Sequence, residues 1–178
     1  MEKWKDIPGM EGFYQASTDG RIRSIDRPVR QHNDAIQIKK GKVLSPAISR
    51  IGYCICALSK NNKLNSYPVH RLVAFAWLGD PPPGMYEINH IDGNKQNNRC
   101  ENLEWSNRIN NLKHAIKNGL MKYNSGERHH NCKFTDAEMH TIMIERLSGK
   151  TLIELGRKYN VFPSTIARIT ERQKLLQS

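Results

Sequence analysis

The segment from residue 86 to residue 118 constrains the fold most, because the spacing of its apolar residues changes from that of strands to that of a helix. Residues 86–90 read as a strand, and the Asp-, Gly- and Asn-rich stretch after them reads as a loop. Residues 103–105 form the next expected strand. Ser106 can then cap a helix that runs to about Asn118. The segment therefore predicts a strand-loop-strand-helix unit.

The sequence before this unit predicts a β-rich region followed by one helix. Short strands separated by glycine turns are expected over residues 1–27, and a polar arm or long hairpin over 28–50. A strand over 51–58 runs into the turn at 60–63. A helix over 69–78 follows, because its apolar residues share one face and an Asp-Pro-Pro-Pro-Gly run ends it.

Residues 133–178 predict three short helices. Thr135 and Thr151 are each followed three residues later by glutamate, which is the capping-box pattern. Pro163 can occupy the first position of the third helix after a tight turn, so the segment predicts a helix-turn-helix module, although a bundle used only for packing has the same pattern. The basic outer face of the third helix favours DNA. Its expected contact residues are Ser164, Thr165, Arg168 and Arg172.

The chain is strongly basic, with a formal net charge of +11. Basic proteins of this kind usually bind polyanions, and nucleic acid is the commonest of these. The charge is concentrated in residues 28–65, which hold seven basic side chains and one acid, Asp34. We expect this β-rich stretch to contact phosphates, and the alternative is a solvated hairpin. The expected contact residues are Arg30, Lys39, Lys40, Lys42 and Arg50.

Composition also argues against some locations and partners. No apolar run reaches the roughly 18 residues that a membrane span needs, and residues 1–9 do not resemble a signal peptide. We therefore expect a soluble, cytoplasmic protein that acts as a monomer without a membrane or protein partner. The four cysteines contain no CxxC pair, so we expect no structural zinc, even at Cys132 with its neighbours His129 and His130.

The central segment closely resembles the HNH (His-Me finger) endonucleases of phages and mobile introns. It reads EINHIDGNK at 87–95 and ENLEW at 101–105, and VHRLVA at 69–74 matches the helix that usually leads into this motif. WKDIPG at 4–9 looks like the small nuclease-associated module that often precedes it. The helix-turn-helix pattern resembles the DNA-reading tail that such enzymes often carry. Most of the chain is covered, residues 28–65 less so.

This resemblance implies an α+β fold in a homing-type enzyme of a bacterium or a phage-infected cell. The expected parts are a β-rich N-terminal region, a ββα-metal nuclease core and a C-terminal helix-turn-helix module. In residue numbers they are 1–65, with the nuclease-associated module at 1–27, then the core at 66–118, a linker at 119–132 and the helix-turn-helix module at 133–178.

Phosphodiester hydrolysis needs a base for water and positive charge near the phosphate and the leaving oxygen. His90 can be the base, because a neutral imidazole accepts a proton near pH 7. A lone histidine at a strand end is more often structural, and the surrounding motif decides for catalysis. By the resemblance, Asn89 and Asn110 are metal ligands. His114 lies one turn beyond Asn110 on the same face of the expected helix and is a rival ligand. Asn102 is expected to orient His90 through the second ring nitrogen, although it also suits a hairpin turn.

Both expected ligands are neutral amides, where many relatives have Asp or His at the position of Asn89 and His at that of Asn110. Amide oxygens suit one Mg²⁺ or Mn²⁺ ion but add no negative charge. We therefore expect weak metal binding without DNA, with phosphate oxygens completing the site. One metal and one base cut one strand per visit, so we expect nicking of double-stranded DNA.

Two other functions are consistent with parts of the pattern. One is a non-catalytic DNA-binding regulator on a nuclease scaffold, although a regulator has no need of His90, Asn102 and Asn110 together. The other is an RNA-cleaving enzyme, although a helix-turn-helix module suits the major groove of B-form DNA. Metal-dependent DNA cleavage accounts for most of the chain and is the function that the sequence predicts.

Overall fold

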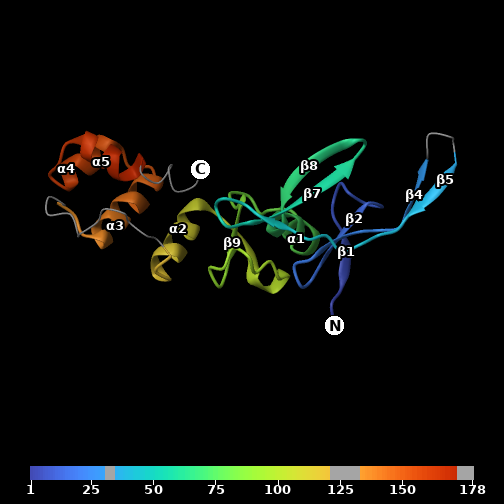
Figure 1. The fold of residues 1–178 in the computed structure, drawn as a ribbon. Helices are drawn as coiled ribbons and strands as arrows, with labels where there is room; N and C mark the ends of the chain where they lie inside the picture. The colour runs from blue at the N-terminus through green and yellow to red at the C-terminus, as the bar shows by residue number, and fades with distance from the viewer. Residues whose placement is uncertain (31–34, 121–132, 172–178) are drawn as a thin grey trace. The chain divides into compact units, whose positions relative to one another are not determined.

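The computed structural model describes residues 1–30, 35–120 and 133–171, and the chain forms two compact units, Met1–Asn107 and Arg108–Ser178. The first unit is built of small antiparallel sheets around one helix, and the second is helical (Figure 1). The expected mixed α+β class, with a β-rich N-terminal region and C-terminal helices, is confirmed. Within the described ranges, no helix has the length and apolar character needed to cross a membrane.

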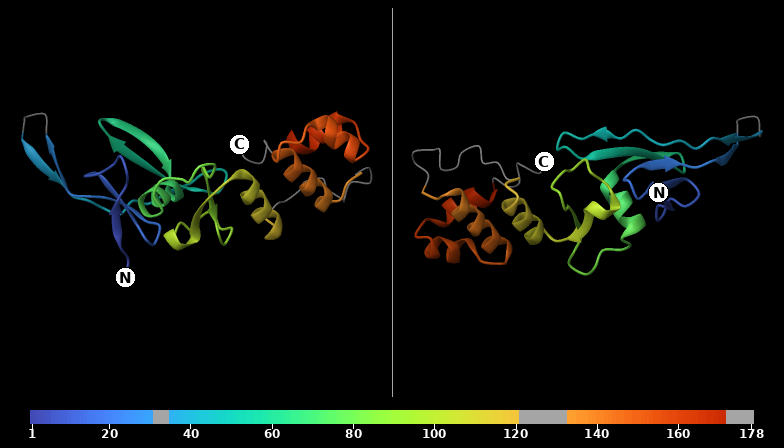
Figure 2. Two further views of the ribbon diagram at one scale, coloured as in Figure 1. Left: turned by 180° about the vertical axis from the view of Figure 1, so that it is seen from behind. Right: turned by 90° about the horizontal axis from the view of Figure 1, so that it is seen from below.

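The strands of the first unit lie in four antiparallel groups. Two are three-stranded, β1-β2-β3 and β6-β7-β8, and two are two-stranded, β4-β5 and β9-β10. The β4-β5 pair forms a ribbon that extends away from the other sheets (Figures 1 and 2). The strands are β1 (Trp4–Asp6), β2 (Tyr14–Ser17), β3 (Ile22–Ser24), β4 (Arg27–Arg30), β5 (Ile36–Lys39), β6 (Ala47–Ile48), β7 (Cys54–Lys60), β8 (Lys63–Pro68), β9 (Glu87–His90) and β10 (Leu103–Ser106).

Helix α1 (Val69–Trp77) lies at the centre of the first unit, and its apolar face supplies much of the core. Leu72 and Val73 pack there with Ile7 and Tyr14 from the N-terminal sheet and with Leu103 from β10. Burial of such side chains contributes about 1.5–3 kcal/mol each relative to exposure. The two regions that the sequence treats as separate motifs therefore share one core.

The turn between β7 and β8 has the geometry that its sequence predicts. Asn61 and Asn62 have φ values of 52° and 60°, and Lys60 pairs with Lys63 across the turn. Two consecutive positive φ values are those of a type I′ turn, which asparagine tolerates and which matches the twist of a hairpin. The predicted hairpin tip is confirmed.

The second unit contains four helices in its described part, and its core gathers side chains from all of them. They are α2 (Arg108–Lys117), α3 (Asp136–Leu147), α4 (Leu152–Lys158) and α5 (Pro163–Glu171). Both predicted capping boxes are present, since Thr135 and Thr151 each accept a hydrogen bond from the backbone of the glutamate three residues on. Pro163 opens α5 as predicted, after a turn in which Asn160 has φ 50°.

One expectation about the start of α2 differs from the structure. Ser106 is not a helix cap, because it is the last residue of β10 and pairs with Glu87, and the helix begins two residues later at Arg108. Leu112 of α2 packs in the core that α3 and α5 share, so the division between the units falls before α2. The domain boundaries expected from the sequence, including the linker at 119–132, stay predictions.

Candidate active site

His90 is the last residue of β9, directly before the loop, as the sequence predicts. Its side chain is only 5% exposed and lies among aromatic rings. The His70 ring meets it edge-on at 5.3 Å between centroids, and the Tyr53 ring lies 5.9 Å away. Three segments of the first unit therefore hold the imidazole: the start of β7, the start of α1 and the β9-β10 hairpin.

Burial among these side chains favours the neutral form of His90. Burial is the largest influence and lowers the pKa of its imidazole below the ordinary value, with a further lowering from the charge of Lys95. The hydrogen bond to Asn98 and the charge of Asp92 oppose this shift but do not reverse it. A histidine with a lowered pKa is unprotonated at pH 7, which is the state that a general base needs.

Asn98 is the amide that contacts the His90 ring, with Oδ1 at 3.4 Å from Nε2. Its own orientation is set because Nδ2 donates to the carbonyl of Gln96 at 3.1 Å. The Oδ1 atom only accepts, so the ring proton sits on Nε2 and Nδ1 keeps a free electron pair. Asn98 is buried, with 5% of its surface exposed, whereas Asn94 and Asn97 of the same loop are more exposed. In the sequence Asn98 is one of several asparagines of an expected loop, and no local pattern predicts its burial.

Asn102 does not make the hydrogen bond to His90 that we expected. Its Oδ1 accepts from the backbone N–H of Asp92 at 3.0 Å, and its Nδ2 donates to Asp92 and to the carbonyl of Asn97 at 2.9 and 2.8 Å. These hydrogen bonds hold the Asn102 amide in the loop, and the contact to the ring comes from Asn98 instead. The carboxylate of Asp92 is held in the same network, and hydrogen bonds, first that from the Asn97 side chain and then that from Asn102, lower its pKa.

The turn at residues 17–20 supports the loop from outside. The N–H of Cys100 donates to the carbonyl of Thr18 at 3.0 Å, and Arg99 forms an ion pair with Asp19 at 3.6 Å. Gly20 approaches so closely that a Cβ atom there would lie 2.5 Å from the backbone carbonyl of Asn98. The turn of the N-terminal sheet thus packs against residues 98–100, which include Asn98, the residue that contacts His90.

Asn89 lies opposite Glu104 in the β9-β10 hairpin, and its Nδ2 donates to the Glu104 carboxylate at 2.8 Å. The Oδ1 atom of Asn89 is left as an acceptor, and Glu104 has a second oxygen. Carboxylate and amide oxygens are the donors that Mg²⁺ and Mn²⁺ prefer, so these residues fit such an ion. Glu104 was not expected from the sequence to contact Asn89. The pairing register of the two-stranded hairpin places residue 104 opposite residue 89.

The other expected ligands, Asn110 and His114, are on α2 in the second unit, where Asn110 is exposed and His114 is half-buried. Their roles stay predictions. Among the residues with described positions, no three or more His, Cys, Asp or Glu side chains form a metal-binding cluster. Cys132, His129 and His130 lie outside those residues.

The residues expected to bind DNA are on the surface where the structure describes them. Arg30 and Lys39 are exposed on the β4-β5 ribbon, and Ser164 and Arg168 are exposed on α5. Lys40, Lys42 and Arg50 are exposed as well, and Thr165 is half-buried. Arg172 lies outside the described residues. Contact of these side chains with DNA stays a prediction.

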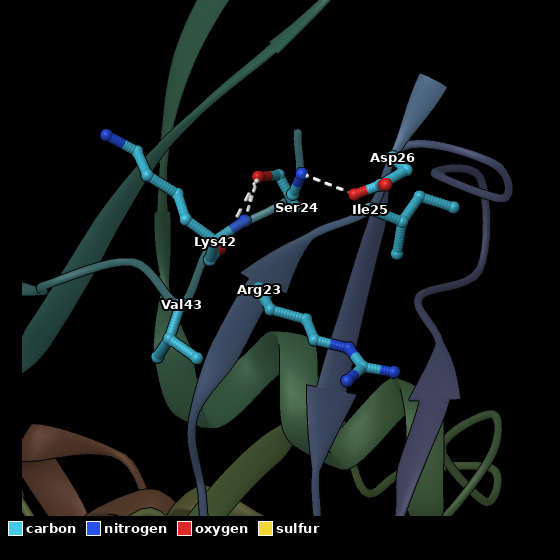
Figure 3. Close-up of a pocket in the computed structure, with 7 residues that line it drawn as sticks. Arg23, Ser24, Ile25, Asp26, Lys42 and Val43 are labelled. Atoms are coloured by element: carbon cyan, nitrogen blue, oxygen red, sulfur yellow. Dashed lines mark hydrogen bonds between the residues drawn. The ribbon is translucent and has the colours of Figure 1, made fainter. Parts of the chain in front are cut away.

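The base of the ribbon is tied to β3 (Figure 3). Ser24 and Lys42 exchange hydrogen bonds, and Asp26 accepts from the N–H of Gly41 at 2.7 Å. Arg23 lines the same pocket, so two basic side chains flank the point where the ribbon leaves the sheet. These contacts fix the root of the basic ribbon to the N-terminal sheet.

His70 gives the fold a pH dependence that can be measured. Burial is the main cause that lowers its pKa to about 4, so the folded state holds it neutral while the unfolded chain protonates it near pH 6.5. Its contribution to stability is fully present above pH 6.5 and is lost as the pH falls toward 4. Over that window we expect about 3 kcal/mol of lost stability from this group.

Urea unfolding at pH 4.5, 5.5 and 7 checks this expectation. His70→Gln removes the titrating group, so its stability should change less over that range than that of the unaltered chain. The other histidines are common to both proteins and cancel in the comparison. The same pH dependence in both proteins would contradict the assignment.

Family models match two consecutive segments of the chain. A model described as the NUMOD4 motif matches residues 2–59, and one described as HNH endonuclease matches residues 67–113. The second match contains His90, its loop and both strands of the hairpin. The chain belongs to the HNH endonuclease family. Its HNH segment is preceded by a NUMOD4 module, and the resemblance drawn from the sequence is confirmed. The family implies a divalent metal, without fixing which ion.

Named relatives agree with this assignment. The DNA endonuclease I-HmuI of Bacillus phage SP01 is 33% identical over 126 residues, which are 71% of this chain and 64% of that protein. YosQ, an SPbeta prophage-derived protein of Bacillus subtilis (strain 168), is 38% identical over 109 residues, which are 61% of this chain and 62% of that protein. An uncharacterized HNH endonuclease of Acanthamoeba polyphaga mimivirus, L245, is 42% identical over 68% of this chain and 32% of its own length.

A solved structure has the same fold over most of the chain. It describes DNA binding and cleavage by the HNH homing endonuclease I-HmuI, with a TM-score of 0.54 and 33% identity over 68% of this chain and 62% of that one. This chain therefore spans less than two thirds of the length of each of these relatives. The shared part includes the HNH motif, which carries the candidate base.

Proposed function

We propose that this protein is a metal-dependent, homing-type endonuclease that hydrolyses phosphodiester bonds in double-stranded DNA. The observation that carries the proposal is His90, a buried, neutral histidine whose Nε2 faces the amide oxygen of Asn98 at 3.4 Å. That contact leaves Nδ1 to accept a proton. Membership of the HNH family and the likeness to I-HmuI support the same reaction.

The residues divide the work of hydrolysis. His90 Nδ1 takes the proton from a water molecule as the water oxygen attacks the phosphorus and the bond from phosphorus to the leaving oxygen breaks. Asn98 Oδ1 accepts from the Nε2–H of the imidazolium that results and stabilises it. Asn89 would hold the divalent cation, and the role of Asn110 as a ligand stays a prediction. The cation, when bound, supplies positive charge near the scissile phosphate and the leaving oxygen. Asn102 and Asp92 keep the loop closed so that Asn98 stays against the ring.

A site with a single general base activates one water molecule and cleaves one strand at a time. We therefore propose that a monomer nicks DNA. Cleavage of supercoiled plasmid with Mg²⁺ or Mn²⁺ tests it, with the unaltered chain and His90→Ala compared at limiting enzyme. Equal cleavage by both proteins rejects the mechanism, and direct conversion to linear DNA rejects nicking. DNA binding without cleavage by either protein would instead favour a regulator on a nuclease scaffold.

We also propose that the β4-β5 ribbon contacts DNA phosphates. Replacing Arg30 and Lys39 by alanine removes two exposed charges from the ribbon, one from each strand. Each phosphate contact contributes about 0.9 to the slope of log affinity against log salt, so the slope should fall by about 2. Titration of a labelled duplex at several salt concentrations measures this.

The matched control for the ribbon removes two exposed lysines from the edge of the first sheet, Lys3 and Lys5. It changes the net charge equally and should leave the salt slope nearly unchanged. A slope that falls equally in both double variants would remove the assignment of the ribbon, because the effect would then follow from net charge alone.

A further inference from the structure

The Asn89–Glu104 pair carries an inference about the metal site that rests on the proposed function. Asn89 is 9% exposed, and its only described hydrogen-bond partner is the Glu104 carboxylate at 2.8 Å. The pair forms across directly opposed positions of β9 and β10. The hairpin register therefore fixes the two side chains next to each other.

The chemistry of this pair decides which end of the amide is free. A carboxylate only accepts hydrogen bonds, so it takes the NH₂ end of Asn89 and leaves the carbonyl oxygen unbound by this contact. An asparagine side chain without such a partner can point either its oxygen or its NH₂ group toward a given position with little difference in free energy. A cation is attracted to the oxygen and repelled by the NH₂ group, so the orientation matters for binding.

Within the described part of the chain, the charge of Glu104 is not used by the loop network or by an ion pair, unlike the charges of Asp92 and Glu101. Asp92 accepts hydrogen bonds from Asn94, Asn97 and Asn102 within the loop, which leaves its oxygens occupied. Glu101 lies 3.7 Å from Arg99. Among residues 1–30, 35–120 and 133–171, no lysine or arginine forms an ion pair with Glu104.

We propose that Glu104 is a positioning residue for the divalent cation: it turns the carbonyl oxygen of Asn89 toward the ion and supplies the negative charge that an asparagine ligand lacks. An aspartate at position 89 would supply both the ligand oxygen and the negative charge. Here Asn89 of β9 supplies the oxygen and Glu104 of β10 supplies the charge. This arrangement also revises the expectation that the protein's contribution to the site is made of neutral amides only.

Mn²⁺ binding to the intact chain without DNA tests this directly, because electron paramagnetic resonance counts free Mn²⁺ during a titration. Loss of a partner that orients a metal ligand typically weakens affinity by about 10–100-fold, and we expect Glu104→Gln to do so. Glu101→Gln removes another exposed carboxylate from the segment between the two strands and should bind Mn²⁺ like the unaltered chain. Glu104 is exposed, so both variants should unfold at the same temperature as the unaltered chain.

A second background makes the test specific for the pair. Asn89→Asp supplies its own charge and needs no partner to orient it, so Glu104→Gln in that background should lower Mn²⁺ affinity much less than it does beside Asn89. An equal loss in both backgrounds would overturn the proposal, because the effect of Glu104 would then be independent of residue 89. Equal Mn²⁺ affinity of Glu104→Gln and the unaltered chain would overturn it as well.

The Mg²⁺ concentration for half-maximal plasmid cleavage gives a second reading. It should rise at least tenfold in Glu104→Gln, while the rate at saturating Mg²⁺ stays close to that of the unaltered chain. An unchanged Mg²⁺ requirement would reject the role of Glu104 even if the metal bound too weakly for resonance without DNA. Absence of metal-dependent cleavage by the unaltered chain would reject the proposed function, a different result from any of these.

Discussion

Replacing His90 by alanine is expected to lower the rate of plasmid cleavage by about 10²–10⁴-fold, because general-base catalysis contributes rate factors of that size. DNA binding should change little, since the basic ribbon and the C-terminal helices do not depend on this imidazole. The reason for the loss is the free electron pair on Nδ1, which no neighbouring side chain replaces: His70 is buried, and the charges around it oppose its protonation.

The pH profile separates loss of a base from loss of structure. The pKa of His90 is lowered by burial, so cleavage by the unaltered chain should stay nearly constant from pH 8 to below 6.5 and fall only in more acidic solution. His140→Ala, in the other unit, removes a histidine from α3 and should cut at the normal rate. A His90→Ala variant with the same rate and the same pH profile as the unaltered chain would contradict the mechanism.

Gly20→Ala is expected to impair both stability and cleavage, although residue 20 is far from His90 in the sequence. The new Cβ would lie 2.5 Å from the backbone C and O of Asn98 and 2.9 Å from the N of Arg99. These are backbone atoms that cannot rotate away, so the loop has to shift and carry Asn98 off the imidazole. Residue 20 also has φ +81°, which costs about 1–2 kcal/mol for a residue with a side chain.

The control for this variant is Gly12→Ala. Gly12 has nearly the same backbone conformation, φ +75°, but a Cβ there meets no atom within 4 Å. It reports the cost of the conformation alone, measured by thermal unfolding, and should leave the cleavage rate intact. If Gly20→Ala loses no more stability and no more cleavage than Gly12→Ala, the turn does not support the loop in the way proposed.

Local sequence patterns predicted the elements because their causes are local. The capping boxes at Thr135 and Thr151, the start of α5 at Pro163 and the turn at Asn61 and Asn62 each depend on residues within one turn of chain. The same reasoning placed His90 at a strand end, and spacing alone was sufficient for that.

The contacts of the site depend on tertiary structure, and the sequence predicted fewer of them. Asn98 was indistinguishable from the other asparagines of its loop until the fold buried it against His90. Glu104 becomes a partner of Asn89 only through the register of the hairpin. Ser106 has the side chain of a helix cap, but continued strand pairing with Glu87 extends β10 through it.

The bracing of the HNH loop by the turn at residues 17–20 has an evolutionary consequence. Families that match as separate segments are often regarded as cassettes that recombination can exchange. Here Ile7 and Tyr14 from the NUMOD4 module share a core with Leu72 and Leu103 from the HNH segment, and the carbonyl of Thr18 anchors Cys100. A chimera that joins this HNH segment to a foreign module would inherit a catalytic loop without its support, unless the donor brought an equivalent glycine turn. In this protein the NUMOD4 and HNH segments therefore have to be kept together for the HNH loop to keep its support.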